Sequence, residues 1–268
     1  EGSIEKDDII KIELSENKHI FSTSNKHLFI NSREQFYIID IINYKILIRE
    51  NKICKAIDTF IFPNLELTVV AHDVVDIYDD NLNLLHSYNK INLVPFGEFL
   101  PLETILKKIG LRSITNNYQS FSHGNERKVI EINRENFSLN ILPLICYEII
   151  YSGKIFDNSD FDLIINISED GWFGQSIGPK QHFNHSIFRA IESGKYVLRS
   201  ANNGIAAIIN PLGIVEKKVD FGNSGYIDFN ERKKVQPTVF SKYGNKIFGL
   251  LILLYIFLIF SFNRMDYE

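Results

Sequence analysis

A run of sixteen uncharged residues near the C-terminal end limits most strongly what this chain can fold into. The run, 247–262, reads IFGLLILLYIFLIFSF. As a helix it would be about 24 Å long, slightly less than the ~30 Å hydrocarbon core of a membrane. A buried core helix is the alternative, but such a helix usually carries a polar stripe, and this run has none. We therefore predict a transmembrane helix over 246–263, with basic flanking side chains that reach toward the membrane surface.

The rest of the chain, residues 1–240, predicts one α/β domain. The chain has 268 residues and is 45% hydrophobic, which excludes a disordered protein. Its net charge of −4 argues against nucleic acid as a partner, because such proteins normally present a basic face. The two cysteines, Cys54 and Cys146, are too few for a disulfide scaffold. Because the first residue is Glu1 and not Met, we expect a processed protein or part of a longer one.

Hydrophobic periodicity places several strands and helices within this domain. Helical patterns cover Leu102–Ile109 and Ser186–Gly194. Turn-forming residues lie at Asp79–Asn83 and Asn210–Gly213. Apolar runs typical of strands are Gln35–Ile42, Leu67–Val75, Ser138–Ile145, Asp162–Ile167, Tyr196–Ser200 and Gly204–Ile209.

Cys146 stands directly after one of these predicted strands. The apolar run Ile141–Ile145 precedes it and Glu148 follows two residues later. The end of a central strand is where α/β folds expose reactive groups, and the nearby carboxylate could tune the thiol or take its proton. A cysteine that only fills the core is the alternative.

Two further polar clusters flank predicted strands. The segment Lys90–Pro101 combines Lys90 and Glu98 with two prolines and a glycine, which indicates a fixed loop whose ammonium could stabilise an oxyanion. A solvent-facing Lys and Glu would give the same composition. The segment Asn166–Gly174 contains the only tryptophan, Trp172, and alternatively is a surface loop with one anchoring aromatic residue.

Two histidines at the start of a predicted helix are a weaker candidate for chemistry. His182 and His185 are three residues apart, with no third metal ligand in view, so we interpret them as solvent-facing or structural and predict no metal site. The sequence also lacks the serine-hydrolase, phosphate-binding and zinc-protease motifs.

The three clusters, in this order, resemble the nitrilase superfamily and, more closely, its apolipoprotein N-acyltransferase branch. The resemblance rests on K-x-x-L-V-P-F-G-E-F-x-P, I-C-Y-E, N-I-S-x-D-x-W-F-G, G-P-x-Q-H and the run that begins R-A-I-E-S-G-K-Y. It covers about Tyr88 to Gly213, and the C-terminal uncharged run extends it. The resemblance implies a four-layer α-β-β-α sandwich, truncated at its N-terminal side and followed by one transmembrane helix.

The resemblance also implies an activity and its residues. Cys146 would take an acyl chain from a phospholipid as a thioester and pass it to the amine of a diacylglyceryl-cysteine at an apolipoprotein N-terminus. Lys90 would stabilise the oxyanion, and Glu98, Tyr147 and Glu148 would support the site. Trp172 would contact the substrate. The resemblance implies no metal or organic cofactor, and it places the protein in the bacterial inner membrane with its catalytic domain facing the periplasm.

The general base is where the sequence departs from the family. The family's glutamate stands in a short P-E motif before the lysine, and the only candidate here is Glu1, followed by Gly2 and Ser3. The 89-residue separation from Lys90 is longer than expected, and an insertion within Phe21–Phe62 would account for it. A cut point unrelated to catalysis is the alternative for Glu1.

Two other functions fit the same residues. One is a membrane-tethered nitrilase or amidase that hydrolyses C–N bonds. The other is an inactive fragment of the acyltransferase. The uncharged C-terminal run and the segment Val94–Pro101 favour the acyltransferase.

Overall fold

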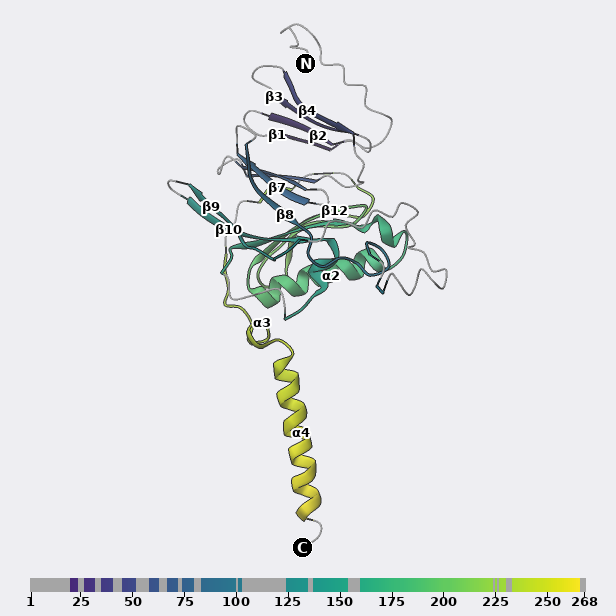
Figure 1. The fold of residues 1–268 in the computed structure, drawn as a ribbon, viewed down its shortest axis with the longest axis vertical. Helices are drawn as coiled ribbons and strands as arrows, with labels where there is room; N and C mark the ends of the chain where they lie inside the picture. The colour runs from purple at the N-terminus through teal and green to yellow at the C-terminus, as the bar shows by residue number, and fades with distance from the viewer. Residues whose placement is uncertain are drawn as a thin grey trace.

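The computed structural model describes the chain in segments: residues 20–23, 27–31, 35–40, 45–51, 58–62, 67–71, 74–79, 83–99, 101–102, 124–134, 137–153, 160–223, 225, 227–229 and 233–265. Within them lie two four-stranded sheets and one six-stranded sheet. Figure 1 shows the sheets stacked along the long axis of the molecule, with helix α2 below them and helix α4 projecting away from the body. The predicted α/β class is therefore confirmed.

The six-stranded sheet positions the candidate site. Its spatial order is β14-β13-β12-β11-β10-β9, with β10, β11 and β12 parallel and the outer strands antiparallel. The bounds are β9 Ile130–Arg134, β10 Phe137–Ile145, β11 Leu163–Glu169, β12 Tyr196–Asn202, β13 Ala206–Ile209 and β14 Val215–Val219. Because the carboxyl ends of parallel strands meet at one edge, the residues that follow β10 and β11 lie close together there.

Alternation along the strands builds a separate core on each face of this sheet. Leu139, Ile141 and Ile145 point into one core, and Leu142 and Leu144 point into the other. The first core also receives residues of β7 and β8, and the second receives residues of helix α2. Successive strand side chains point to opposite faces, so a strand covered on both sides buries nearly every residue. Six of the seven residues of β11 are buried, and four of these are Leu or Ile.

Helix α2, Gly178–Ser193, covers the face of the sheet that is opposite β7 and β8. Pro179 lies in its first turn, where the missing N–H costs no helical hydrogen bond. Gly194 ends it with a φ of +64°, and the Gly194 N–H donates to the carbonyl of Ala190. The sequence predicted only the second half of this helix, Ser186–Gly194, because the polar first half has no apolar periodicity.

Two antiparallel sheets precede the six-stranded one. Their orders are β1-β2-β3-β4 and β5-β6-β7-β8. The strands are β1 Ile20–Thr23, β2 His27–Asn31, β3 Gln35–Asp40, β4 Lys45–Asn51, β5 Asp58–Phe62, β6 Leu67–Ala71, β7 Val74–Asp79 and β8 Leu84–Asn89. Val75, Ile77 and Tyr88 of the second sheet are buried against the six-stranded sheet, so two β layers pack face to face.

The structure corrects the predicted strand Leu67–Val75. Two strands occupy this range, and Ala71 of β6 pairs with Val75 of β7, so the chain reverses direction between them. A continuous apolar run does not reveal such a reversal. The predicted helix beyond Leu102 and the middle of the predicted turn at 79–83 lie outside the described residues. The described part of the chain also contains a helix layer on only one side of the paired sheets, so the second helix layer of the predicted sandwich is not seen there.

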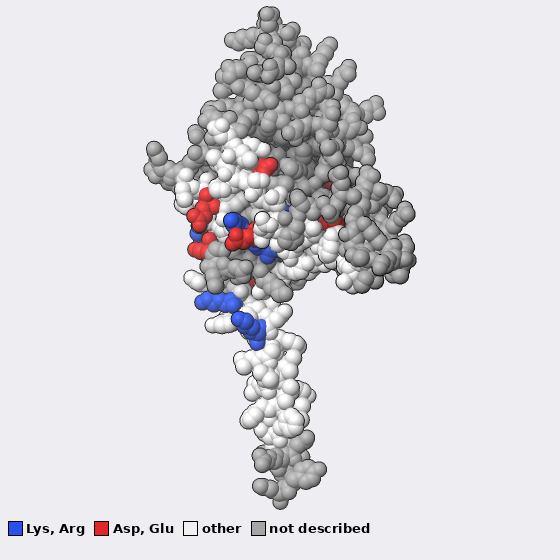
Figure 2. Space-filling view, viewed as in Figure 1, with Lys and Arg blue, Asp and Glu red and all other residues white. Residues whose placement is uncertain are grey.

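The chain ends in two helices, α3 (Val239–Tyr243) and α4 (Lys246–Met265). Side chains all around α4 are exposed, and Phe248, Leu250, Leu253, Phe257 and Phe260 each have at least 65% of their surface accessible. Figure 2 shows basic side chains where α3 meets α4 and an uncharged surface beyond them. In the part of the chain that the structure describes, no helix is both long and apolar enough to cross a membrane. The predicted transmembrane span is therefore not confirmed.

Candidate active site

Cys146 lies in a sharp turn at the carboxyl end of β10. It begins the 3₁₀ helix η2, Cys146–Ile150, directly after the buried Ile145. Its φ is +49°, a left-handed conformation that non-glycine residues rarely adopt. Such a backbone costs of the order of ~1–3 kcal/mol and persists only where surrounding contacts hold it. The turn therefore presents the thiol at the sheet edge only because its neighbours hold it.

The carboxylate of Glu148 is the first of these neighbours. It is fully buried, and its Oε2 accepts a hydrogen bond from the N–H of Ile145 at 2.8 Å. Its Oε1 accepts from the N–H groups of Ile91 and Asn92 at 3.0 and 3.1 Å. One side chain thus joins the turn of Cys146 to the segment that follows β8.

Tyr88 and Arg127 complete the surroundings of Glu148. The Tyr88 hydroxyl lies 3.2 Å from both carboxylate oxygens, and the Arg127 guanidinium lies 3.5 Å from Oε1. Burial and, after it, the charge of Glu148 raise the pKa of Tyr88, so the phenol keeps its proton and donates. With all these donors around it, the Glu148 carboxylate is committed to structure, which favours a supporting role over proton transfer with Cys146.

Lys90 and Glu98 form a partly buried ion pair beside this cluster. Lys90 is 6% exposed, and its Nζ lies 2.6 Å from Oε1 of Glu98. The other carboxylate oxygen of Glu98 accepts from the N–H of Val94 at 2.9 Å, and the Glu98 N–H donates to the carbonyl of Val94 at 2.8 Å. The loop is therefore closed on itself, as its composition predicted, and it holds the ammonium of Lys90 in a fixed place.

A second buried carboxylate, Asp170, follows β11 at the same sheet edge, in the 3₁₀ helix η3 (Asp170–Phe173). Its Oδ1 accepts from the Ser168 hydroxyl at 2.6 Å and lies 2.8 Å from Nδ1 of His182. Its Oδ2 accepts from Nη2 of Arg199 at 2.8 Å. Burial by itself would raise the pKa of Asp170, but the bonds from His182 and Ser168 and the charge of Arg199 outweigh it and lower that pKa.

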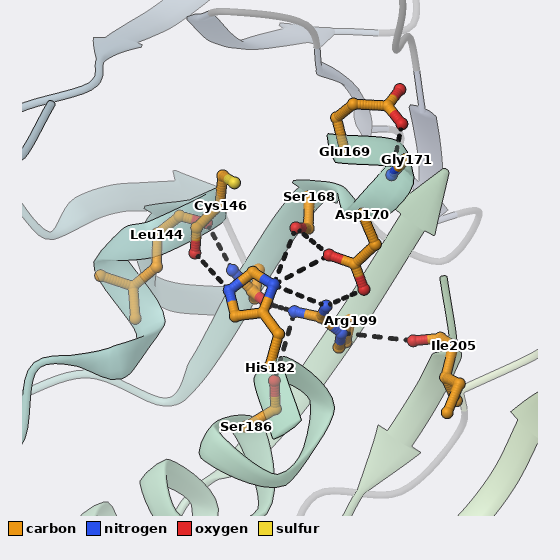
Figure 3. Close-up of polar contacts among 11 residues, drawn as sticks. Leu144, Cys146, Ser168, Glu169, Asp170, Gly171, His182, Ser186, Arg199 and Ile205 are labelled. Atoms are coloured by element: carbon orange, nitrogen blue, oxygen red, sulfur yellow. Dashed lines mark hydrogen bonds and ion pairs between the residues drawn. The ribbon is translucent and has the colours of Figure 1, made fainter. Parts of the chain in front are cut away.

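The same network reaches the strand that carries Cys146. The other ring nitrogen of His182, Nε2, lies 3.2 Å from the carbonyl oxygen of Cys146. Arg199 also donates to Asn166, whose amide donates to the carbonyl of Leu144 at 3.0 Å. Figure 3 shows these side chains converging beneath the Cys146 turn while the sulfur points away from them.

The structure places most of the predicted site residues around this turn. It brings Lys90, Glu98, Cys146 and Glu148 into one cluster. Lys90 pairs with Glu98, and Glu148 accepts hydrogen bonds from the residue after Lys90 and from the residue before Cys146. Tyr147 is half-buried and its ring meets that of Tyr151 edge-on at 5.7 Å.

Trp172 makes no contact with this cluster among the described residues. Trp172 belongs to the 3₁₀ helix η3 and is 61% exposed, so its ring lies at the surface. Glu1 lies outside the described residues, and so does Cys54.

The sequence-based interpretation missed Asp170 and Arg199 and left His182 without a contact to the site. His182 is 4% exposed and contacts the site directly. The sequence left a structural role open for His182, but its spacing from His185 gave no sign of this contact. Among the described residues, no group of three or more His, Cys, Asp and Glu side chains is arranged to hold a metal ion.

The site combines a cysteine at the end of a strand, a lysine–glutamate ion pair and two buried carboxylates. Together with the paired sheets, these features define an α/β protein with a candidate cysteine nucleophile. The carbon-nitrogen hydrolase family model matches residues 63–230, and the chain belongs to this family of enzymes. The match begins after Glu1 and includes every other predicted site residue.

Several relatives are apolipoprotein N-acyltransferases. The protein of Rickettsia bellii (strain RML369-C) is 44% identical over 189 residues, covering 70% of this chain and 36% of that protein. That of Rickettsia prowazekii (strain Madrid E) is 40% identical over 176 residues, covering 65% and 34%. A solved amidase variant from Nesterenkonia sp. AN1 has 14% identity and a TM-score of 0.38, covering 59% of this chain and 53% of its own. The chain thus spans about a third of the length of the curated relatives it matches.

Proposed function

We propose that this chain transfers an acyl group from a phospholipid to the N-terminal amine of diacylglyceryl apolipoproteins through a thioester on Cys146. The observation that carries the proposal is the pair of hydrogen bonds that the Glu148 carboxylate accepts from Ile145 and Ile91. They join the strained turn at Cys146 to the segment that contains the buried Lys90. The names of the relatives support acyl transfer as the reaction. Residues 1–240 would form the catalytic domain and residues 246–263 its membrane attachment.

In the first step, the sulfur of Cys146 attacks the ester carbonyl of the phospholipid. The general base takes the thiol proton as the S–C bond forms. The C–O bond then breaks to release a lysophospholipid alcohol, which takes that proton from the base. The ammonium of Lys90 stabilises the negative charge that develops on the carbonyl oxygen. Glu98 fixes the ammonium from its other side through the 2.6 Å ion pair.

In the second step, the amine of the lipoprotein N-terminus attacks the thioester. The N–C bond forms, the C–S bond breaks, and the base takes the amine proton while Cys146 is restored. We propose Glu1 as this base, and Trp172, whose ring is exposed at the sheet edge, as a contact for substrate.

We further propose that α4 lies in lipid and that the protein belongs to a bacterial inner membrane, with its catalytic domain on the periplasmic side. The apolar side chains of α4 are exposed all around the helix, and Lys242 and Lys246 stand where α4 leaves the body. An environment-sensitive fluorophore on Leu254→Cys should be quenched by lipids that carry a quencher in their acyl chains. A fluorophore on Lys242→Cys is the matched control, and equal quenching at both positions contradicts the proposal.

The competing function is hydrolysis of small amides or nitriles by the same nucleophile. The assay that separates the two functions offers the full-length protein a phospholipid with a labelled acyl chain and a diacylglyceryl-cysteine peptide. We expect label on the peptide amine with wild type and with Cys54→Ala, and none with Cys146→Ala. Ammonia release from an amide, with no labelled peptide, would establish the hydrolase instead.

Substitution of Lys90 tests the oxyanion role. Lys90→Ala should lower the rate of acyl transfer by about 100-fold, since loss of one oxyanion donor has that cost. Lys128→Ala is the matched control, because Lys128 is 69% exposed and pairs with exposed Glu126. A Lys90→Ala rate within a few-fold of wild type would remove Lys90 from the mechanism.

Substitution of Glu1 tests the base. Glu1→Gln should abolish acyl transfer, and Glu5→Gln, four residues further along, should leave it unchanged. Activity retained in Glu1→Gln would show that the base is another residue.

A further inference from the structure

His182 bridges the Cys146 turn and the buried carboxylate of Asp170. It projects from the first turns of α2, 4% exposed, with Nδ1 at 2.8 Å from Oδ1 of Asp170 and Nε2 at 3.2 Å from the carbonyl oxygen of Cys146. In Figure 3 the carbonyl of Cys146 faces the imidazole and its sulfur faces away. The contact therefore acts on the backbone of the nucleophile and leaves the thiol free.

The partners of the imidazole decide which of its nitrogens carry protons. A backbone carbonyl can only accept a hydrogen bond, and Asp170, whose pKa is lowered, is an acceptor as well. Ser168 and Arg199 each lie 3.4 Å from Nδ1, but both donate to Asp170 at the shorter distances of 2.6 and 2.8 Å. The nearest partner of each ring nitrogen is thus an acceptor, which fits an imidazole that donates from Nδ1 and from Nε2.

The left-handed backbone of Cys146 needs a stabilising contact both before and after this residue. The N–H of Ile145, before the turn, is bound by Glu148 at 2.8 Å. The carbonyl of Cys146, which opens the 3₁₀ helix η2, lies 3.2 Å from Nε2 of the buried His182. Without the bond to His182, the peptide group after Cys146 can rotate and move the thiol away from its attacking position. Small displacements of reacting groups lower reaction rates strongly.

We propose that His182 is a positioning residue, which donates from Nε2 to the Cys146 carbonyl and from Nδ1 to Asp170 and so keeps the nucleophile turn in its strained conformation. This inference rests on the proposed role of Cys146 as nucleophile. It assigns to the histidine a function that requires neither a metal nor contact with substrate.

Two substitutions of His182 separate its two bonds. Glutamine can place a donor near the position of Nε2 and asparagine near that of Nδ1, so His182→Gln keeps the bond to Cys146 and His182→Asn keeps the bond to Asp170. The measurement is the rate at which iodoacetamide alkylates Cys146 in the full-length protein, followed by mass spectrometry of the peptide that contains it. His185→Asn, on the same helix, is the matched control.

We expect His182→Asn to slow alkylation about 10-fold and His182→Gln to stay within about 3-fold of wild type. The proposal is overturned if His182→Asn reacts as fast as wild type, or if His182→Gln is as slow as His182→Asn. The melting temperatures of all variants are measured in parallel, since a merely structural histidine would change stability without this difference between the two substitutions.

A measurement on the wild-type protein keeps the test independent of how the variants fold. Nitrogen-15 spectra of histidine-labelled protein at pH 7 should show both His182 nitrogens protonated, and an unprotonated Nε2 overturns the proposal. Alkylation needs no acyl donor, so a failure of acyl transfer alongside the expected alkylation pattern would refute the proposed function and leave the role of His182 intact.

Discussion

Two buried carboxylates lie near the Cys146 turn, Glu148 with a direct bond to Ile145 and Asp170 linked through His182, and they have different partners. Glu148 accepts mostly from backbone N–H groups, on Ile145 before the cysteine and on the segment after β8. Asp170 accepts only from side chains, which come from β11, α2 and β12. The first carboxylate therefore fixes where the chain runs, and the second fixes how polar side chains beneath the turn are oriented.

The largest effect should come from removing the charge of Glu148. Glu148→Gln replaces one buried acceptor oxygen with an NH₂ group that faces N–H donors. Each unsatisfied buried donor costs about 1–3 kcal/mol, so we expect the free energy of unfolding to fall by about 3 kcal/mol. With the turn released, alkylation of Cys146 should fall about 100-fold. Chemical denaturation and peptide mass spectrometry measure the two effects.

The matched control for Glu148 is Glu126→Gln, at an exposed glutamate paired with Lys128. It should change neither quantity. If Glu148→Gln unfolds and reacts like wild type, Glu148 does not hold the turn, and the contrast with Asp170 loses its basis.

A smaller effect is expected where the backbone comes close to Asp170. A Cβ on Gly204 would lie 2.7 Å from Cγ of Asp170 and overlap the carboxylate that binds Arg199. Gly204→Ala should therefore lower the free energy of unfolding by about 1–3 kcal/mol, as overpacking does. Gly249→Ala is the control, because a Cβ there meets no atom within 4 Å. Equal stability of Gly204→Ala and wild type would show that the Asp170 cluster is loosely packed.

The smallest effect is a difference in how stability depends on pH. The pKa of Asp170 is lowered in the folded protein, so its contribution is complete above its ordinary pKa of about 4. That contribution is lost as the pH falls through the folded-state value, because the unfolded chain binds the proton first. Asp170→Asn should therefore lose less stability than wild type between about pH 5 and pH 3.

Asp220→Asn is the control for this comparison, since Asp220 is exposed and pairs with exposed Lys218. Denaturant melts at a series of pH values give the slopes. Parallel slopes for wild type and Asp170→Asn would contradict the ionised state of Asp170 on which the assignment of the His182 protons depends.

Local patterns were sufficient to predict the parts of the site that are contiguous in sequence. The apolar run that ends at Ile145 predicted a strand end at Cys146, and the composition of Lys90–Pro101 predicted a fixed loop; both are confirmed. The strands β10 to β13 were predicted to within a few residues, because burial on both faces makes their sequences apolar.

The Asp170 cluster could not be predicted in the same way. Its members lie up to 33 residues apart, between Asn166 and Arg199, and meet only because β11 and β12 are parallel neighbours under α2. Nothing in the residues around His182 indicates that its ring faces the carbonyl of Cys146. The strands before β6 were mostly missed as well, since the periodicity of that region identified only Gln35–Ile42.

The most direct test of the account is to trap the acyl group on the enzyme. The full-length protein is incubated with a phospholipid that carries a labelled acyl chain, without an acceptor peptide, and the adduct is then treated with hydroxylamine. We predict a hydroxylamine-sensitive label on the peptide that contains Cys146, equally in wild type and Cys54→Ala and absent in Cys146→Ala. Label that survives hydroxylamine, or that Cys146→Ala retains, would contradict the thioester and with it the proposed function.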